Sequence, residues 1–120
     1  MKFASSRSSP LVAVISVVIS FEFVSAQAQN ASNHGAALYK TKCAMCHGLD
    51  GAGKTPVGQK VSVRDLRPPE VQKQSDSDLA DVIGQGKGKM PAFGKILSDD
   101  QIKLLVAHIR ELERSSSSKR

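Results

Sequence analysis

The last third of the chain carries a regular alternation of apolar and polar positions. Five apolar residues lie three or four positions apart: Ile102, Leu105, Val106, Ile109 and Leu112. This spacing places them on one face of an α-helix. Ser98 and Gln101 stand just before the run and form a capping box, in which two side chains satisfy free N–H groups of the first turn. The pattern predicts an amphipathic helix that starts after Ser98 and runs to about residue 112.

Two shorter helices are predicted upstream. Residues 75–78 read Ser-Asp-Ser-Asp, a dense group of capping side chains, and the helix that they open runs through the apolar positions in 79–83 until two glycines end it. Asn33 is expected to cap another helix over residues 35–43, to which Tyr39 contributes apolar contact.

The segments between these helices have the composition of loops. Residues 48–69 contain four glycines and three prolines, and residues 87–94 read KGKMPAFG. A long loop inside a compact domain is usually functional, so we expect residues 48–69 to wrap a ligand, with at most a short helical turn at 61–66. We find no strand pattern. The predicted fold class is all-α, with about three to four helices and long loops.

The first residues have the organisation of a secretory signal. Lys2 and Arg7 precede an apolar run from Leu11 to Ile19, and Val24-Ser25-Ala26 places small residues where a signal peptidase cleaves. A membrane-spanning helix needs roughly 20 apolar residues, and this run is shorter and interrupted by polar residues. An uncleaved membrane anchor is the alternative reading of this segment.

We therefore divide the chain into three parts. They are a cleaved signal peptide over residues 1–26, a folded domain over 27–114 and a flexible tail over 115–120. The protein is expected to be periplasmic or otherwise exported, with no stable membrane insertion after cleavage.

Composition indicates a domain with a small core of its own. Tyr39 and Phe93 are the only aromatic residues after position 26, and the chain has no tryptophan. Aromatic side chains usually supply much of the buried area, and domains below about 100 residues often need a staple. A disulfide between Cys43 and Cys46 would close a very small loop and constrain little. We expect a bound group to complete the core.

The charge of the chain restricts its partners. The formal net charge is +6 at pH 7. A basic surface suits nucleic acid, acidic lipid or an acidic protein. Export removes the protein from nucleic acid, so we expect no nucleic-acid partner.

Residues 43–47 read CAMCH and contain the only two cysteines of the chain. A thioredoxin-like redox pair belongs with alternating strands and helices, and strand patterns are missing here. A zinc site needs a fourth ligand, and there is no second cysteine pair. The third reading is haem attachment: Cys43 and Cys46 add to the haem vinyl groups, and His47 then lies beneath the iron as the proximal ligand. We favour this reading, with one covalently bound haem c per chain.

Four side chains after position 26 could supply a second axial ligand: His34, Met45, Met90 and His108. Met45 lies between the two cysteines and cannot reach the opposite face of a ring that they hold. His34 is close to the predicted signal junction, and His108 flanks the apolar stripe of the last helix as a surface or inter-helix residue. Met90 lies in a loop well downstream of His47 and precedes a stiffening proline. Met90 is the predicted sixth ligand, with a gap-filling core methionine as the alternative role.

The order of helix, CAMCH, glycine-rich loop, short helix, KMPAF and terminal helix resembles that of the small class I c-type cytochromes with one haem. The likeness covers roughly residues 35–112, and the pairing of CAMCH with MPAF is more specific than either motif alone. The resemblance implies a cytochrome c-like fold wrapped around one covalently bound haem.

The resemblance also implies two details of packing. The first and last helices of the family cross at a tight contact, which here involves Gly35 and Tyr39 against the apolar stripe of the last helix. A loop proline of the family offers its carbonyl to the proximal histidine, and Pro56 is the candidate here. The family often carries an aromatic residue where this chain has His108.

With His47 and Met90 both bound, the iron has no open position and passes single electrons with little rearrangement. We predict a monomeric periplasmic electron carrier and not an enzyme. Its redox partners are expected to present an acidic docking surface to exposed lysines, namely Lys54, Lys60, Lys87, Lys89 and Lys95. The alternatives are a haem-bearing subunit of a larger dehydrogenase or oxidase, and a haem enzyme in which Met90 dissociates.

Overall fold

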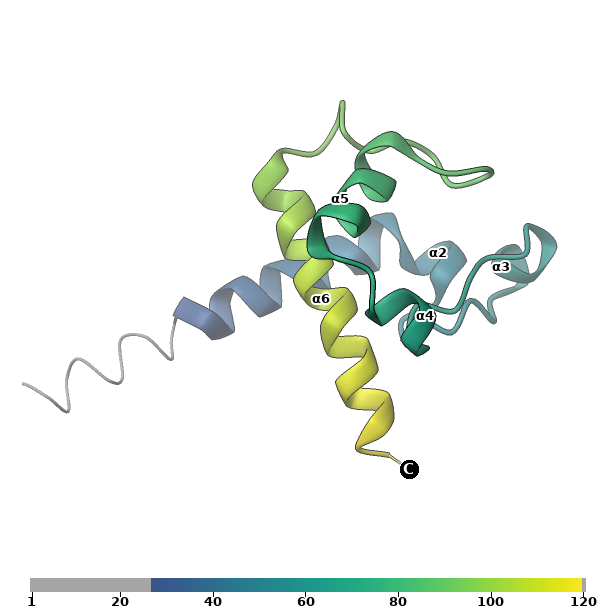
Figure 1. Ribbon diagram of the computed structural model, residues 1–120, viewed down its shortest axis with the longest axis horizontal. Coiled ribbons are helices and arrows are strands. Elements are labelled where there is room, and N and C mark those ends of the chain that lie inside the picture. The colour runs from purple at the N-terminus through teal and green to yellow at the C-terminus, as the bar shows by residue number, and fades with distance from the viewer. Residues whose placement is uncertain (1–26, 120) are drawn as a thin grey trace, which may run out of the picture. The chain divides into compact units, whose positions relative to one another are not determined.

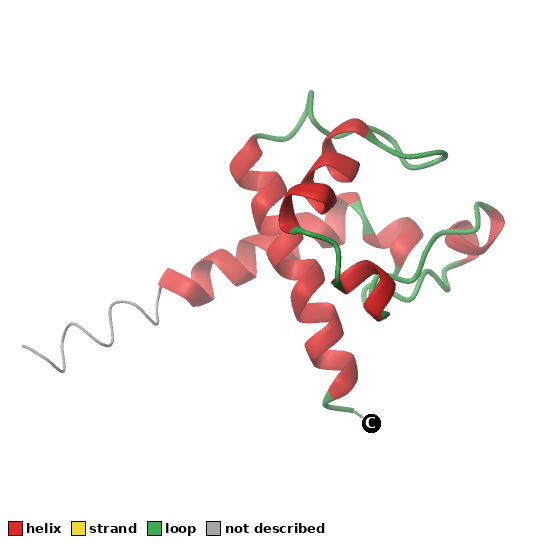
Figure 2. Cartoon of the chain, in the orientation of Figure 1, coloured by secondary structure: helices red, strands yellow, loops and turns green. Residues whose placement is uncertain are grey.

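The computed structural model describes residues 27–119. The chain forms two compact units, and the first ends at Asn30; its described residues, 27–30, are helical. The second unit begins at Ala31 with helical residues 31–42, here called the N-terminal helix. Its further helices are α2 (Ala44–His47), α3 (Pro56–Lys60), α4 (Pro69–Gln72), α5 (Asp76–Gln85) and α6 (Asp99–Ser117). Figure 2 shows helices and loops without a strand in the described part of the chain, so the predicted all-α class is confirmed.

The two capping boxes start their helices as predicted. At α6 the Ser98 hydroxyl accepts the Gln101 N–H at 3.2 Å, and the Gln101 side chain accepts the Ser98 N–H at 2.9 Å. At α5 Ser75 and Asp78 form the same pair of bonds. The five apolar residues of the predicted stripe are all buried in α6. The helix continues to Ser117, three residues into the segment for which we expected a flexible tail.

The hydrophobic core lies between α5, α6 and the N-terminal helix. Its buried members include both aromatic residues, Tyr39 and Phe93, and the largest side chains that are almost completely buried are Tyr39 and Leu105. Figure 1 shows α6 running through this unit with α5 against it. The core therefore contains every tyrosine and phenylalanine side chain of the described residues.

Close contact between the N-terminal helix and α6 depends on Gly35. A Cβ atom at this position would lie 2.6 Å from the Leu104 carbonyl oxygen of α6, which is inside van der Waals contact. The predicted crossing at Gly35 and Tyr39 is therefore present. Asn33, which was predicted to cap this helix, does not start it, because residues 27–42 are all helical and Asn33 lies inside the helical stretch.

Substitution of Gly35 by alanine is expected to lower the free energy of unfolding by about 1–3 kcal/mol, because the helices must move apart. Gly84 is a matched control, since it is also helical and an added Cβ would have Ile102 as its nearest neighbour at 3.9 Å. Gly84→Ala should leave stability unchanged or raise it by up to about 1 kcal/mol. Chemical denaturation measures both; equal stability of the two variants would contradict the tight crossing.

The long segment between α2 and α5 is more ordered than predicted. Within residues 48–69, where we expected at most one helical turn at 61–66, it contains α3, and residues 61–66 are not helical. The second helix, α4, begins at the end of that segment. Thr55 caps α3 by accepting the Gly58 N–H at 2.9 Å, and Pro56 occupies the first turn. Pro69 likewise occupies the first turn of α4. A proline in the first turn after an extended residue is a helix-start signal that the loop-like composition concealed.

Candidate functional site

The CAMCH motif forms one helical turn that carries both cysteines and the histidine. The Cys43 carbonyl accepts the N–H groups of Cys46 at 3.1 Å and His47 at 2.9 Å. Both thiols are free and half-buried. Burial raises the pKa of the Cys43 thiol to about 11, and the nearby Cys46 adds to the effect.

One observation argues against a zinc site. Among the described residues, no group of three or more histidine, cysteine, aspartate or glutamate side chains is placed to hold a metal ion. Cys43, Cys46 and His47 are therefore not arranged around a common metal position, and a structural zinc site would need a fourth ligand as well.

His47 is held in a protected position on this turn. Its Nδ1 atom is buried and has no hydrogen-bond partner among the described residues. Burial lowers the pKa of His47. The backbone of Arg64 acts in the opposite direction and raises this pKa, although its contact with the imidazole does not have normal hydrogen-bond geometry. Burial therefore favours the neutral imidazole, the form in which histidine binds metals. Pro56, suggested by the resemblance as the partner of His47, is exposed at the start of α3.

The short helix α3 packs directly on the motif turn. The Thr55 hydroxyl shares its one hydrogen between the backbone carbonyls of Met45 at 2.8 Å and Cys46 at 2.9 Å. A Cβ atom at Gly58 would collide with the Cys46 carbonyl oxygen, so only glycine fits there. Thr55 and Gly58 were not identified from the sequence. The Thr-Pro pair at 55–56 could have marked them, since it is the start signal of a helix.

Met90 lies in a tightly anchored loop after α5. Lys87 and Met90 exchange two backbone hydrogen bonds, of 3.2 and 3.0 Å, around a two-residue turn. The Phe93 N–H then donates to the Ile83 carbonyl at 3.0 Å, which ties the loop to α5. A Cβ at Gly86 would lie 2.7 Å from the Met90 carbonyl oxygen. The loop backbone is therefore fixed on both sides of Met90, whose side chain is half-buried against the core.

The other candidate axial ligands lie in different surroundings. Met45 is 71% exposed on the motif turn, and His34 is exposed on the N-terminal helix. The His108 ring packs against Tyr39 with 4.8 Å between ring centroids, so it is the inter-helix residue that we expected and fills the place of the family's aromatic residue. Burial lowers the pKa of His108, while Glu111, 3.7 Å from its Nδ1, opposes the shift.

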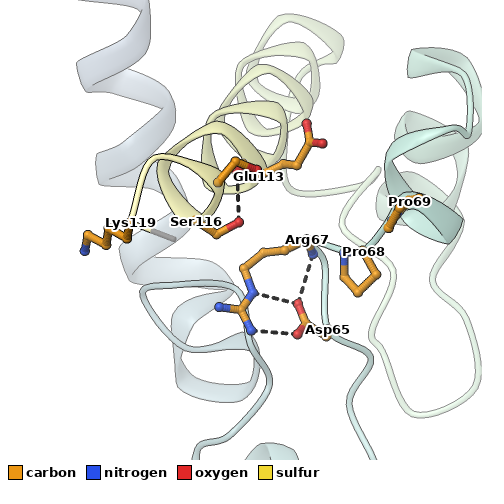
Figure 3. A pocket seen from close by; sticks show the side chains of 8 residues that line it. Asp65, Arg67, Pro68, Pro69, Glu113, Ser116 and Lys119 are labelled. Carbon is orange, nitrogen blue, oxygen red and sulfur yellow. Dashed lines mark hydrogen bonds and ion pairs between the residues drawn. The ribbon is translucent and has the colours of Figure 1, made fainter.

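A separate hollow of about 700 Å³ lies between α4 and the end of α6 (Figure 3). The Arg67 guanidinium donates two hydrogen bonds to Asp65, of 2.9 and 2.7 Å, and this interaction lowers the pKa of Asp65. Pro68, Glu113 and Lys119 also line the hollow. None of the predicted site residues lines it, and two of its four charged side chains, Asp65 and Arg67, pair with each other.

The surface around the two loops is basic and partly apolar. The five lysines predicted to meet a partner are all exposed, and none of them forms an ion pair within the described residues. Four large apolar side chains are also exposed: Met45, Leu49, Val57 and Ile96. Mixed apolar and cationic surface of this kind suits a transient protein contact.

An all-α fold and a CxxCH turn are the features that the resemblance to c-type cytochromes implies. Comparison with known proteins agrees. Residues 30–109 match the family described as cytochrome C oxidase, cbb3-type, subunit III. The chain belongs to this family of c-type cytochromes, whose cofactor is haem c and whose function is electron transfer. The resemblance to small class I cytochromes is confirmed.

Individual relatives include both small and large proteins. Cytochrome c6 of Gloeothece citriformis (strain PCC 7424) is 30% identical over 79% of this chain and 84% of its own length. Cytochrome c6 of Aphanizomenon flos-aquae is 36% identical over 64% of this chain and 85% of its own length. The cbb3-type cytochrome c oxidase subunit CcoP of Azospirillum brasilense is 33% identical over 68% of this chain, which spans only 28% of that subunit.

A solved structure supports the fold assignment. The KustC0563 c-type cytochrome superposes with a TM-score of 0.61 at 32% sequence identity. The match covers 66% of this chain and 96% of that protein. The second unit described above therefore has the fold of a c-type cytochrome.

Proposed function

We propose that this protein is an exported one-electron carrier with a single haem c, attached through Cys43 and Cys46 and ligated by His47 and Met90. The observation that carries the proposal is the single helical turn that carries both cysteines and a half-buried histidine whose Nδ1 atom is buried. The anchored Met90 loop supplies the second ligand. When bound, haem c supplies an iron centre that takes up and releases one electron.

Each of these residues has a role that its surroundings support. Cys43 and Cys46 fix the ring to the chain, so the group stays bound during redox cycling. His47 offers a neutral imidazole, and the backbone of the turn holds it. Met90 offers a soft thioether from a loop whose backbone is tied to α5, and this geometry changes little between oxidation states. Small rearrangement favours rapid electron exchange.

The residues around Met90 do not support an enzymatic role. Residues 84–97 contain no histidine, arginine or carboxylate, so this loop has no acid–base pair of the kind that peroxide cleavage needs. With both axial positions occupied, the reduced wild-type protein is expected to leave its visible spectrum unchanged when carbon monoxide is added. A rapid spectral change with carbon monoxide would instead favour an enzyme in which Met90 dissociates.

Export remains part of the proposal. The predicted signal peptide, residues 1–26, lies outside the described residues. Within residues 27–119, no helix combines the length and the apolar character that crossing a membrane requires. The similarity to cytochromes c6 is consistent with a small exported carrier.

A second candidate function is a haem-bearing subunit of a larger oxidase. The match to the CcoP subunit is the observation that favours it. Purification from native membranes and from the soluble exported fraction separates the two candidates. A carrier is recovered alone as a monomer, whereas a subunit is recovered in a complex with its oxidase or dehydrogenase.

The exposed lysines support docking to an acidic redox partner. Exchange of Lys87 and Lys89 for glutamine should slow association at low salt by on the order of threefold to tenfold and flatten the salt dependence. The difference should fade at high ionic strength, because charges act within a Debye length of about 8 Å in physiological salt. Stopped-flow measurement of electron transfer from the native donor, at several salt concentrations, gives the association rate and its salt dependence.

A charge-matched variant controls for net charge. Lys73 and Lys103 lie at the end of α4 and on α6, away from the Met90 loop in the sequence, and are exposed. Their exchange for glutamine removes the same charge and should change the rate much less. An equal effect of both double variants would assign the steering to net charge and not to the loop.

A further inference from the structure

Tyr39 is bonded to both ends of the CAMCH motif. Its backbone carbonyl accepts the Cys43 N–H at 2.8 Å, at the start of the motif. Its side-chain hydroxyl donates to the Gly48 carbonyl at 2.9 Å, just after His47. A single residue therefore spans the whole motif, with one backbone bond and one side-chain bond.

The Tyr39 side chain is itself rigidly held. It is 1% exposed, and its ring packs on that of His108 from α6. Gly35, one helical turn earlier, lets the two helices approach closely enough for this packing. Burial raises the pKa of Tyr39, so the hydroxyl keeps its proton and remains a donor. The bond to Gly48 is thus made from a fixed position in the core.

The backbone after His47 is constrained from several sides. The Gly48 N–H donates to the Ala44 carbonyl at 2.9 Å, and the Gly48 carbonyl also accepts the Gly51 N–H at 3.2 Å. The His47 carbonyl accepts the Gly53 N–H at 2.7 Å. Together with the bond from the Tyr39 hydroxyl, these backbone bonds form what we call the frame around residues 47 and 48. The bond from Tyr39 is the only one of these contacts that comes from a side chain.

The frame matters because the backbone of residues 43–48 carries the His47 side chain. A ligating histidine is normally oriented by a bond from its second ring nitrogen, and here Nδ1 is buried without a partner of normal hydrogen-bond geometry, while the Arg64 backbone also acts on the imidazole. The direction of the ring therefore depends on the backbone of residues 47 and 48 as well as on Arg64. We propose that Tyr39 is a positioning residue that sets the plane of the His47 imidazole through the Gly48 peptide. This inference rests on the proposed role of His47 as axial ligand.

Tyr39→Phe tests the proposal, because it keeps the buried ring and removes only the hydroxyl. In the oxidised holoprotein the paramagnetic shifts of the haem methyl protons follow the plane of the axial imidazole. We expect the order or the spread of these methyl shifts to change in Tyr39→Phe. Amide exchange at Gly51, measured by NMR, should also become several-fold faster, because the carbonyl that this amide bonds is released.

Ser98→Ala is the matched control. It removes one capping hydrogen bond at the start of α6 and is expected to cause a comparable loss of thermal stability. Its methyl shifts and its Gly51 exchange rate should equal those of the wild type. Wild-type methyl shifts in Tyr39→Phe would overturn the proposal, because Tyr39 would then contribute stability alone.

The outcomes also separate this inference from the proposed function. Haem that washes off the wild-type protein would contradict the proposed function, and Gly51 exchange would still test the bond from Tyr39. Covalent haem in every variant together with unchanged methyl shifts would contradict this inference alone.

Discussion

Replacement of Met90 by alanine is expected to lower the midpoint potential by on the order of 0.1–0.3 V, part of the roughly 0.8 V range that axial ligands span. A thioether is a soft, neutral donor that favours the reduced iron. When it is removed, water or another weak donor is expected to take its place as ligand. The haem should stay on the protein, because Cys43, Cys46 and His47 remain. The far-red sulfur-to-iron band of the oxidised protein should disappear, and the reduced protein should bind carbon monoxide readily.

Two further variants control for this assignment. Met45 is largely exposed, and His108 packs against Tyr39, so neither is expected to bind the iron. Met45→Ala and His108→Ala should keep the potential and the far-red band near those of the wild type. A low-spin spectrum that survives in Met90→Ala and disappears in His108→Ala would make the ligand assignment wrong and indicate a bis-histidine centre.

Simultaneous exchange of Cys43 and Cys46 for serine is expected to abolish covalent attachment of the haem. A serine hydroxyl does not form the thioether bond, so acid–acetone should extract all of the colour from this variant. Each single variant should retain the haem through the remaining thioether, with a red-shifted ferrous spectrum because one vinyl group stays conjugated. The loss should also destabilise the fold, since only two of the twelve buried apolar residues are aromatic and the core is small without the haem.

Met45→Ala is the control for the cysteine variants, because Met45 lies in the same turn and is largely exposed to solvent. It should retain covalent haem fully. Colour that resists extraction from the double serine variant would show that the attachment is made elsewhere.

Features that depend on neighbouring residues could be predicted from the sequence. The capping boxes at Ser75 and Ser98 act within three residues, and both helices begin where those boxes place them. The stripe on α6 is equally local, and all of its members are buried. The grouping of Cys43, Cys46 and His47 follows from spacing on one turn.

Features that depend on distant contacts were harder to predict. The helix α3 has five residues and is held by Thr55 and Gly58 against the motif turn, which a glycine- and proline-rich composition does not reveal. Asn33 has the chemistry of a cap, but helical residues on both sides of it leave no helix end to cap. The bond from Tyr39 to Gly48 joins residues nine positions apart and depends on the packing of two helices.

The central claim is that this chain carries one haem c through Cys43 and Cys46. Acid–acetone extraction of the purified exported protein, followed by intact-mass spectrometry, tests it most directly. We predict that the colour stays with the polypeptide and that the mass equals a chain cleaved near Ala26 plus one haem. Extraction of the haem into the acetone, with a protein mass that contains no haem, would contradict the claim.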